Sequence, residues 1–238
     1  MKKTILVTGA SGGIGGACAR LLAAEGYNVA LHYNKNAAPA EALSQEIGGI
    51  CVGADLRDEA QVKEMFRKIE EAFGSVDVLV NNAGIARQQL FTDSTQADYD
   101  EVFGANMLSA VNCSREALKA MIHNHSGRII NISSMWGVCG ASCEVLYSAS
   151  KAALIGFTKA LAKEVGPSGI TVNCIAPGVI DTKMNANLSA EDIAALADET
   201  PLCRIGTPEE VAKAVAFFAA DSSAFITGQV LGVDGGII

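Results

Sequence analysis

Short apolar runs alternate along the chain with longer segments whose apolar residues recur at helical spacing. The short runs are rich in β-branched residues and predict buried strands, whereas the longer segments predict helices. The predicted strands are Thr4–Val7, Val29–Tyr33, Ile50–Gly53, Val76–Val80, Arg128–Ile132, Ile170–Ile175 and Val230–Val233. The predicted helices are Ile14–Glu25, Pro39–Glu46, Glu59–Phe73, Tyr99–Asn106, Leu108–His123, Leu146–Val165 and Pro208–Ala220. This alternation predicts an α/β fold, in which a doubly wound, Rossmann-type parallel sheet carries helices on both faces.

Residues 1–238 contain no shift in composition that marks a linker, so the chain is predicted to form a single domain. The stretch Gly178–Thr207 breaks the alternation and contains a possible short helix over Ala190–Asp198. An excursion after the carboxyl end of a strand is where α/β folds place ligand-gating loops. A surface insertion without a role is the alternative.

The composition narrows the class of protein. Half of the residues are hydrophobic and 18% are charged, which excludes a disordered chain. The net charge of −8 argues against a nucleic-acid partner, and no apolar run approaches the roughly 18 residues of a membrane helix. Seven scattered cysteines without a CxxC pair indicate a reducing compartment, so a cytoplasmic protein is expected. No cluster of His, Cys and carboxylates has metal-ligand spacing, so no metal is expected.

A glycine-rich segment, Thr8–Gly15, follows the first predicted strand directly and leads into the first helix. Small residues let the backbone come close to a pyrophosphate, and the helix N-terminus offers free N–H groups and partial positive charge. A tight strand–helix turn without a ligand is the alternative. The position after the first strand of a βαβ unit favours a dinucleotide site.

Tyr147 and Lys151 are four residues apart on a predicted helix, so their side chains share one face. A neighbouring ammonium favours the phenolate and lowers the tyrosine pKa toward a range useful for proton transfer. Ser134 lies just past the end of the fifth strand, within reach of the same substrate oxygen. Such a Tyr–Lys pair is also common on ordinary helices, so the interpretation depends on the motifs around it.

These motifs together resemble the short-chain dehydrogenase/reductase family. The pattern T-G-x3-G-x-G begins at Thr8, and further matches follow in the family's order over the full length of the chain. They are Asn81-Asn82-Ala83-Gly84, Asn106, Ser134, Tyr147-x3-Lys151 and Pro177-Gly178. The resemblance implies an oxidoreductase that acts on hydroxyl or carbonyl groups, with catalytic residues Asn106, Ser134, Tyr147 and Lys151.

The resemblance also implies a role for each of these residues. Tyr147 gives a proton to the carbonyl oxygen during reduction, and Ser134 polarises and orients that carbonyl. Lys151 holds the ribose hydroxyls and lowers the Tyr147 pKa, while Asn106 anchors a water relay behind Lys151. The hydride comes from the nicotinamide.

A dinucleotide site is implied by the same resemblance. Its residues are Gly9, Ser11, Gly13, Ile14, Gly15, Tyr33, Asn34, Lys35, Asp55, Leu56, Asn81, Ala83, Gly84, Tyr147, Lys151, Pro177, Gly178, Ile180 and Thr182. Asp55 falls where the family bonds the adenine amino group, and Ile180 and Thr182 where it holds the carboxamide. Asp55 or Asp58 is alternatively an N-cap of the helix that begins at Glu59.

The end of the second strand bears on the choice of cofactor. An NAD enzyme usually has a carboxylate there, whereas this chain has His32-Tyr33-Asn34-Lys35. Lys35 is suited to attract a 2′-phosphate, which favours NADP(H) over NAD(H). Gly12 departs from the expected pattern, since many NADP-dependent relatives carry Arg at that position.

Within the family, the pattern is most similar to the 3-oxoacyl-acyl-carrier-protein reductases. Gly127–Ile130, Gly156–Lys159 and the segment from Thr227 to Gly236 carry this similarity. Ser168 departs from it, because those reductases have a basic residue there that helps dock the acidic carrier protein, although Arg128 remains. The net charge of −8 also opposes an acidic partner.

Three alternatives stay open. The segment Ser133–Tyr147 resembles reductases of an aminopentanone-modified lysine on elongation factor P, for whose amine Glu144 offers a counter-charge. Oxidation of a sugar or alcohol is a second, and a non-catalytic NADP-sensing module is a third. The family resemblance further implies a homotetramer, or possibly a dimer, paired through the helices Leu108–His123 and Leu146–Val165.

Overall fold

Seven parallel strands form one sheet in the computed structural model, which describes residues 2–185 and 189–238. The spatial order of the strands is β3-β2-β1-β4-β5-β6-β7, and each neighbouring pair is parallel. The strands are β1 Thr4–Val7, β2 Asn28–Tyr33, β3 Ile50–Gly53, β4 Val78–Asn81, β5 Gly127–Ile132, β6 Ile170–Pro177 and β7 Val230–Val233. The predicted doubly wound sheet is confirmed, with strand ends that differ from the prediction by up to two residues.

Helices follow the strands along the chain. Those seen in the described residues are α1 Gly13–Ala24, α2 Ala38–Ile47, α3 Glu59–Phe73, α4 Gln96–Phe103, α5 Ser109–His123, α6 Trp136–Cys139, α7 Val145–Val165, α8 Ala190–Glu199 and α9 Pro208–Ala219. The short helix α6 was not predicted, because its four residues are too few to show a helical period.

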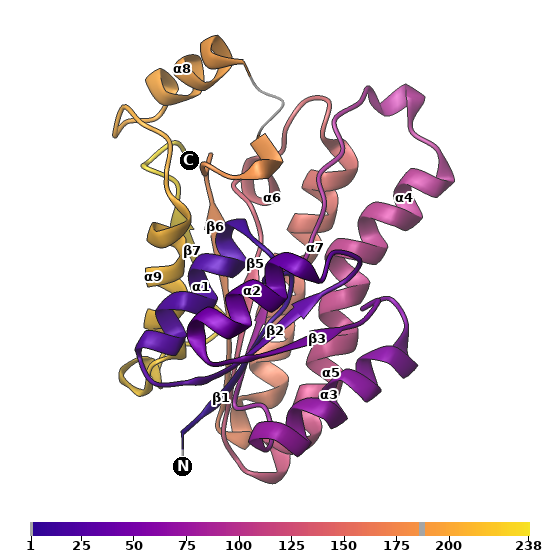
Figure 1. The fold of residues 1–238 in the computed structure, drawn as a ribbon. Helices are drawn as coiled ribbons and strands as arrows, with labels where there is room; N and C mark the ends of the chain where they lie inside the picture. Colours follow the sequence, from indigo (N-terminus) through magenta and orange to yellow (C-terminus); the bar gives the residue numbers. More distant parts are fainter. Residues whose placement is uncertain (1, 186–188) are drawn as a thin grey trace.

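Two layers of helices enclose the sheet, with α1, α2 and α9 on one face and α3, α5 and α7 on the other (Figure 1). Successive residues of β1 pack alternately against the two helix layers. Ile5 and Val7 pack in the α1/α9 layer, whereas Leu6 packs in the α3/α5 layer. This alternation explains why the strands read as continuous apolar runs, since both faces of a covered sheet are buried.

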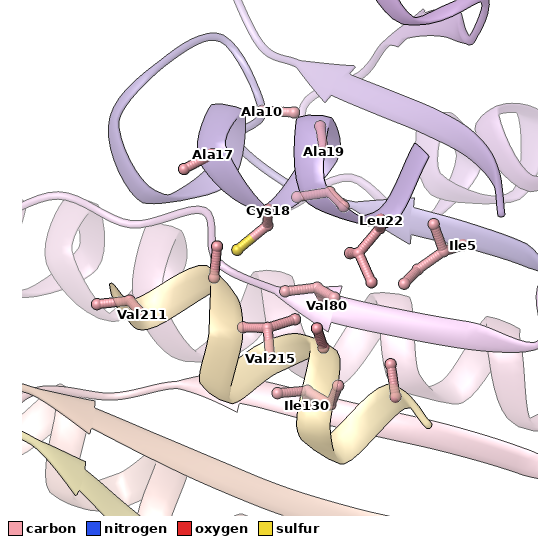
Figure 2. Close-up of a cluster of buried hydrophobic side chains, with 14 of the residues drawn as sticks. Ile5, Ala10, Ala17, Cys18, Ala19, Leu22, Val80, Ile130, Val211 and Val215 are labelled. Atoms are coloured by element: carbon pink, nitrogen blue, oxygen red, sulfur yellow. The ribbon is translucent and has the colours of Figure 1, made fainter. Parts of the chain in front are cut away.

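The core between α1 and α9 is built from small and medium side chains (Figure 2). Cys18 of α1 has no exposed surface and points at α9, where Val211 and Val215 lie. Ala17 and Ala19 flank it on α1. These small residues let the two helices approach each other closely above β1, β4 and β5, which holds the first turn of α1 in place.

Helices α4 and α5 are joined without a break by a π-helical turn over Gly104–Leu108. The prediction of two separate helices, Tyr99–Asn106 and Leu108–His123, is therefore wrong at their junction. A π-turn places one extra residue in the helix and is often found at functional sites. Here it contains Asn106, whose side chain is buried.

The excursion over residues 178–207 contains a short 3-10 turn at Lys183–Asn185 and helix α8, which confirms the predicted helix there. Residues 186–188 of this excursion lie outside the described residues. Figure 1 shows α8, in orange at the top left, beyond the sheet edge at which β6 ends. Within the described part of the chain, no helix is long and apolar enough to cross a membrane.

The packing of α1 on α9 predicts the effect of Cys18→Ser. The serine hydroxyl would be buried without the water that solvates it in the unfolded chain, which costs about 1–3 kcal/mol of the free energy of unfolding. Urea denaturation followed by circular dichroism measures this loss. Cys139→Ser is the matched control, because Cys139 is exposed and its replacement should change stability by less than about 0.5 kcal/mol. Equal losses in the two variants would contradict the packing described.

Candidate active site

The carboxyl ends of β1 and β4 lie side by side at the centre of the sheet, where the strand order reverses direction. In open α/β sheets this switch point is where ligands bind. The glycine-rich segment follows β1 here, and Asn82-Ala83-Gly84 follows β4. Two segments far apart in sequence therefore meet at the switch point, where open α/β sheets form a ligand crevice.

Glycine is required in the loop between β1 and α1 by backbone geometry. Gly9 has φ +65°, and a Cβ on Gly15 would lie 2.4 Å from the carbonyl oxygen of Gly9. By contrast, a Cβ on Gly12 would meet nothing within 4 Å, so Gly12 borders open space. Helix α1 begins after Gly12 with no side-chain cap and no acidic residue in its first turn. Its first N–H groups and its positive dipole end thus suit an anion, and the predicted pyrophosphate fits.

Asn82 fastens the glycine loop to β4. Its Nδ2 donates to the carbonyl oxygens of Thr8, at 2.9 Å, and Gly9, at 3.2 Å. The Thr8 hydroxyl in turn accepts from the backbone N–H groups of Asn82 and Ala83 at 2.9 and 3.0 Å. This role of Asn82 was not predicted from the sequence, since nothing in the motif shows which asparagine turns toward the loop.

Asn81 faces the other way. It is buried, and its Nδ2 donates to Ser114 Oγ at 3.1 Å and to Asn131 Oδ1 at 2.8 Å. The expected contact with the adenosine ribose therefore does not involve this side chain, which bonds instead within the core between β4, β5 and α5. Its Oδ1 is buried and has no hydrogen-bond partner among the described residues.

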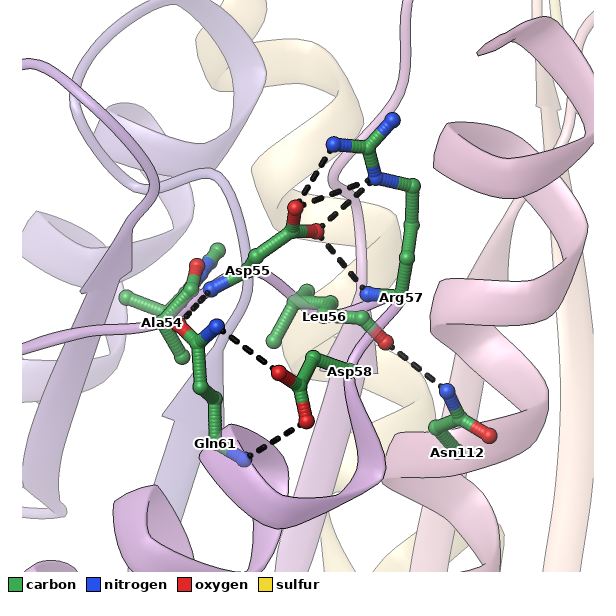
Figure 3. A network of polar contacts seen from close by, with 8 residues as sticks. Ala54, Asp55, Leu56, Arg57, Asp58, Gln61 and Asn112 are labelled. Atoms are coloured by element: carbon green, nitrogen blue, oxygen red, sulfur yellow. Dashed lines mark hydrogen bonds and ion pairs between the residues drawn. The ribbon is translucent and has the colours of Figure 1, made fainter. Parts of the chain in front are cut away.

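The loop after β3 is held from several sides (Figure 3). Arg57 clamps the Asp55 carboxylate, with Nε 2.9 Å from Oδ1 and Nη2 2.6 Å from Oδ2. Gln61 Oε1 accepts from the Asp55 backbone N–H at 2.9 Å. The Asp58 carboxylate accepts from the N–H groups of Ala60 and Gln61 and so caps α3. Asp58 is therefore the N-cap of α3, and Asp55 is not.

Charge at this loop is set by Arg57 and Lys35. The hydrogen bonds from Arg57 hold the pKa of Asp55 below its ordinary value, and the nearby charge of Lys35 lowers the Asp55 pKa further. Asp55 is thus a carboxylate whose charge is already balanced by protein cations. Leu56, predicted to contact the cofactor, has its side chain in the core, and its carbonyl accepts from Asn112 at 3.0 Å.

The end of β2 brings Tyr33, Asn34 and Lys35 to the same edge as Asp55. The phenol of Tyr33 lies across Gly53 of β3, where a Cβ would be 2.8 Å from the ring carbon Cζ. Tyr33 therefore covers the outer strand of the sheet. Asn34 and Lys35 are exposed.

On the other side of the crevice, Asn106 and Lys151 approach the same point beside Gly84. A Cβ on Gly84 would lie 2.8 Å from Asn106 Oδ1 and 3.2 Å from Lys151 Nζ. Asn106 is fixed by its bonds to the backbone of Ile85, with Oδ1 accepting at 2.8 Å and Nδ2 donating at 2.9 Å. Lys151 Nζ donates to the carbonyl of Ile132, at the end of β5, at 2.9 Å.

Tyr147 and Ser134 complete this cluster. Lys151 Nζ lies 5.8 Å from the centre of the Tyr147 ring, and the Ser134 side chain lies close enough to the Tyr147 hydroxyl to lower its pKa. Ser134 Oγ also accepts from the backbone N–H of Trp136 at 3.2 Å. The structure thus brings together the four side chains that sequence reasoning selected as catalytic, from the π-turn, the end of β5 and the first two turns of α7.

Burial controls the charges of this cluster. Desolvation raises the pKa of Tyr147 to about 12, although the neighbouring Ser134 side chain opposes this effect. Desolvation also lowers the pKa of Lys151 to about 8. The expected lowering of the Tyr147 pKa by Lys151 is therefore not found for the protein alone, because burial is the largest influence on the pKa of each group. At neutral pH the tyrosine is a phenol with a proton to donate.

Helix α7 packs closely against α6 and the residue that follows β5 because Gly137 has no side chain. A Cβ on Gly137 would lie 2.7 Å from Ser133 Oγ and 2.8 Å from the carbonyl carbon of Lys151. Ser133 Oγ donates to the Lys151 carbonyl at 2.8 Å. Gly137 and Ser133 were not assigned to the site from the sequence, since their effect is only visible in the contact between the two elements.

The segment after β6 closes the crevice at its far end. The carbonyl of Pro177 accepts from the Met135 N–H at 2.8 Å, and the Gly178 N–H donates to Val233 at 3.0 Å. Ile180 is buried, and its backbone bridges to Gly206. Thr182 lies near the glycine loop, since its Cγ2 would be 3.4 Å from a Cβ on Gly13.

Four further residues considered in the sequence lie on α6 or between α6 and α7. Trp136 opens α6, Cys139 ends it, and Cys143 adopts a positive φ of 60° just before α7. Glu144 is half-buried before α7, and burial raises its pKa. Among the described residues, no group of His, Cys, Asp and Glu could hold a metal ion.

Comparison with known proteins agrees with this geometry. Residues 9–238 match the family described as Enoyl-(Acyl carrier protein) reductase. The 3-oxoacyl-[acyl-carrier-protein] reductase FabG of Staphylococcus aureus is 42% identical over 242 residues, which cover 100% of this chain and 98% of that protein. The uncharacterized oxidoreductase YmfI of Bacillus subtilis is 43% identical, with 99% of each chain covered.

A solved structure shares the whole fold. The crystal structure of a putative gluconate dehydrogenase from Agrobacterium tumefaciens superposes with a TM-score of 0.95 and is 33% identical. The match covers 99% of this chain and 95% of that one. These similarities support an active oxidoreductase rather than a non-catalytic module. The chain belongs to the short-chain dehydrogenase/reductase family, whose members use a nicotinamide cofactor, and it is an oxidoreductase acting on hydroxyl or carbonyl groups.

Proposed function

We propose that this protein is an NADPH-dependent reductase that converts a 3-oxoacyl thioester, carried by acyl carrier protein, to the 3-hydroxyacyl product. The observation that carries the proposal is the convergence of Ser134, Tyr147 and Lys151 beside the glycine loop at one edge of the sheet. The similarity to the Staphylococcus aureus reductase over the full chain supports the substrate class. Residues 1–238 act in this proposal as one domain.

The side chains divide the chemistry between them. When bound, a reduced nicotinamide supplies the hydride. Ser134 donates a hydrogen bond that orients the substrate carbonyl, and Tyr147, protonated at neutral pH, gives its proton to the carbonyl oxygen. Lys151 binds ribose hydroxyls and stabilises the phenolate left on Tyr147, and Asn106 holds the water that returns a proton toward Lys151.

The charges at the adenosine end support NADPH over NADH. The end of β2 has no carboxylate to accept from a ribose hydroxyl, and exposed Lys35 is free to meet a 2′-phosphate. Asp55, the carboxylate at the end of β3, is balanced by Arg57. The remaining predicted contacts line the crevice from the glycine loop, β4 and β6. They are Gly9, Ser11, Gly13, Ile14, Gly15, Ala83, Gly84, Pro177, Gly178, Ile180 and Thr182.

Docking of the carrier protein requires a surface other than the one first expected. Arg128 lies at the amino end of β5, opposite the edge that holds Ser134, and only 11% of its side chain is exposed. Ser168 offers no charge. The thioester group itself, rather than the carrier, is therefore the part of the substrate that the site recognises in this proposal.

The proposed working form is a cytoplasmic homo-oligomer, a tetramer or a dimer. Leu108 in the π-turn, Ile122 of α5 and Val145 of α7 are exposed apolar residues on the segments expected to pair. Burial of such residues against a second copy would remove apolar surface from water.

Turnover of a short thioester tests the proposal directly. Absorbance at the reduced-nicotinamide band is followed with NADPH and NADH in parallel, using acetoacetyl thioester as substrate. NADPH should be consumed faster, and Tyr147→Phe should lower kcat by a factor on the order of 10²–10⁴, because the proton donor is lost. Tyr99→Phe is the matched control, since Tyr99 lies exposed on α4. Turnover by Tyr147→Phe at the normal rate would overturn the assignment, and a preference for NADH would overturn the cofactor.

The pH dependence of reduction follows from Lys151. Its ammonium form is the one that stabilises the phenolate, and burial lowers its pKa to about 8. Activity should therefore be lost as pH rises through about 8. In Lys151→Arg the loss should move to higher pH, because guanidinium keeps its charge, even though kcat is lower. Lys159→Arg, at an exposed position of α7, should leave the profile unchanged. If the loss of activity at high pH occurred at the same pH in Lys151→Arg, another group would be responsible for it.

A second substrate class is favoured by Glu144. This carboxylate is half-buried, and its charge raises the pKa of Tyr147, so it acts at the reacting centre. A ketone that carries an amine, as in an aminopentanone on a lysine of elongation factor P, would place an ammonium beside it. Such a substrate would compensate the burial of Glu144, which a neutral acyl chain cannot do.

Glu144→Gln separates the two classes. The variant should raise KM for an amine-bearing ketone by about tenfold while changing KM for acetoacetyl thioester by less than about twofold, since only the first substrate is cationic. Steady-state kinetics on both ketones measure this, with Glu164→Gln at an exposed position of α7 as control. Unchanged KM for the amine-bearing ketone would remove the second class.

A further inference from the structure

His32 is a buried histidine that the chemistry described above does not use. It lies near the carboxyl end of β2 with 2% of its surface exposed. Its ring reaches the glycine loop on one side and the end of β3 on the other. These are the two segments that would hold the pyrophosphate and the adenosine of a dinucleotide.

The hydrogen bonds define the state of the ring. The Gly9 N–H donates to Nδ1 at 3.1 Å, so Nδ1 carries no proton. Nε2 lies 3.0 Å from the carbonyl oxygen of Ala54, which can only accept, so Nε2 carries the proton. The ring is therefore the neutral Nε2–H tautomer. Burial also lowers the His32 pKa, which agrees with a neutral ring.

Gly9 is fixed at both of its polar atoms. Its N–H bonds to His32, and its carbonyl accepts from Asn82 Nδ2 at 3.2 Å and packs against Gly15. The backbone of His32 adds a further bond, because its carbonyl accepts from the Ala10 N–H at 2.9 Å. His32 thus holds two successive residues of the glycine loop and orients the N–H groups that follow them.

On its other side the ring holds the residue before Asp55. Ala54 is buried, and its N–H donates to the Tyr33 carbonyl at 3.2 Å. Its carbonyl accepts from His32, so Ala54 is tied to β2 at both backbone groups. Asp55 is the next residue, and Arg57 orients its carboxylate.

We propose that His32 is a positioning residue for the cofactor, which sets the glycine loop and the Asp55 loop at the spacing that a dinucleotide requires. The proposal rests on the proposed function in that the ligand is a nicotinamide dinucleotide. Its action is on the ground-state binding of that ligand, because His32 contacts neither the reacting atoms nor Tyr147. Loss of His32 should weaken cofactor binding and leave the chemical step alone.

Two substitutions separate the two hydrogen bonds. An asparagine amide reaches the position of Nδ1 and can still accept from Gly9, whereas a glutamine amide reaches the position of Nε2 and can still donate to Ala54. Binding of NADPH is followed by its fluorescence, and KM for NADPH and kcat are measured with acetoacetyl thioester. We expect His32→Gln to raise the Kd for NADPH by about tenfold and His32→Asn by less than about threefold, consistent with one buried hydrogen bond.

A change in the Kd for NADPH without a change in kcat would identify His32 as a positioning residue. For both variants kcat at saturating NADPH should stay within about twofold of the wild type. His123→Asn, at the exposed end of α5, is the matched control and should change nothing. Equal Kd values for His32→Asn and His32→Gln, or a loss confined to kcat, would overturn the proposal. Wild-type protein that binds neither NADPH nor NADH would instead overturn the proposed function.

A measurement on the unsubstituted protein keeps the test independent of folding. Nitrogen-15 NMR of histidine-labelled protein distinguishes the two neutral tautomers and the imidazolium. The Nε2–H tautomer is expected at neutral pH, and NADPH should leave it unchanged. An Nδ1–H tautomer or an imidazolium would overturn the proposal even if no variant folded.

Discussion

The contact between helix α1 and the backbone of Gly9 is the constraint on which the rest of the site depends. Only a hydrogen atom at Gly15 fits where a Cβ would lie 2.4 Å from the Gly9 carbonyl oxygen. This approach brings the uncapped end of α1 over the switch point of the sheet. Asn82, which follows β4, and His32 of β2 then bond to the same glycine. One close backbone contact therefore sets the positions of elements on both sides of the crevice.

Desolvation is the second force that defines the site. The elements that bring Tyr147 and Lys151 together also remove both from water, which raises one pKa to about 12 and lowers the other to about 8. Both changes favour the uncharged form, which is the phenol of Tyr147 and the free amine of Lys151. A ligand with positive charge or hydroxyl groups alters this balance when it binds. The reactivity of the pair therefore depends on the bound ligand as well as on the two residues.

Much of the fold was predictable because apolar runs buried on both faces leave a clear pattern, and the glycine loop and Tyr147-x3-Lys151 are contiguous signals. The direction of a side chain was harder to predict. Asn81 and Asn82 are neighbours, yet one bonds within the core and the other holds the loop, since successive residues at a strand end face opposite ways. The pKa of Tyr147 depends on burial by distant segments. The role of His32 depends on two backbone groups that no motif contains.

Because of its π-turn, the segment Gly104–Leu108 should be sensitive to any change in its number of residues. An α-helix turns by about 100° for each residue, so the extra residue rotates everything before it relative to everything after it. Deletion of a single residue here would let α4 and α5 merge into a regular helix and swing Asn106 away from Gly84 and Lys151. Relatives that keep this amide should therefore keep the number of residues in the turn, with neither a gap nor an insertion within it.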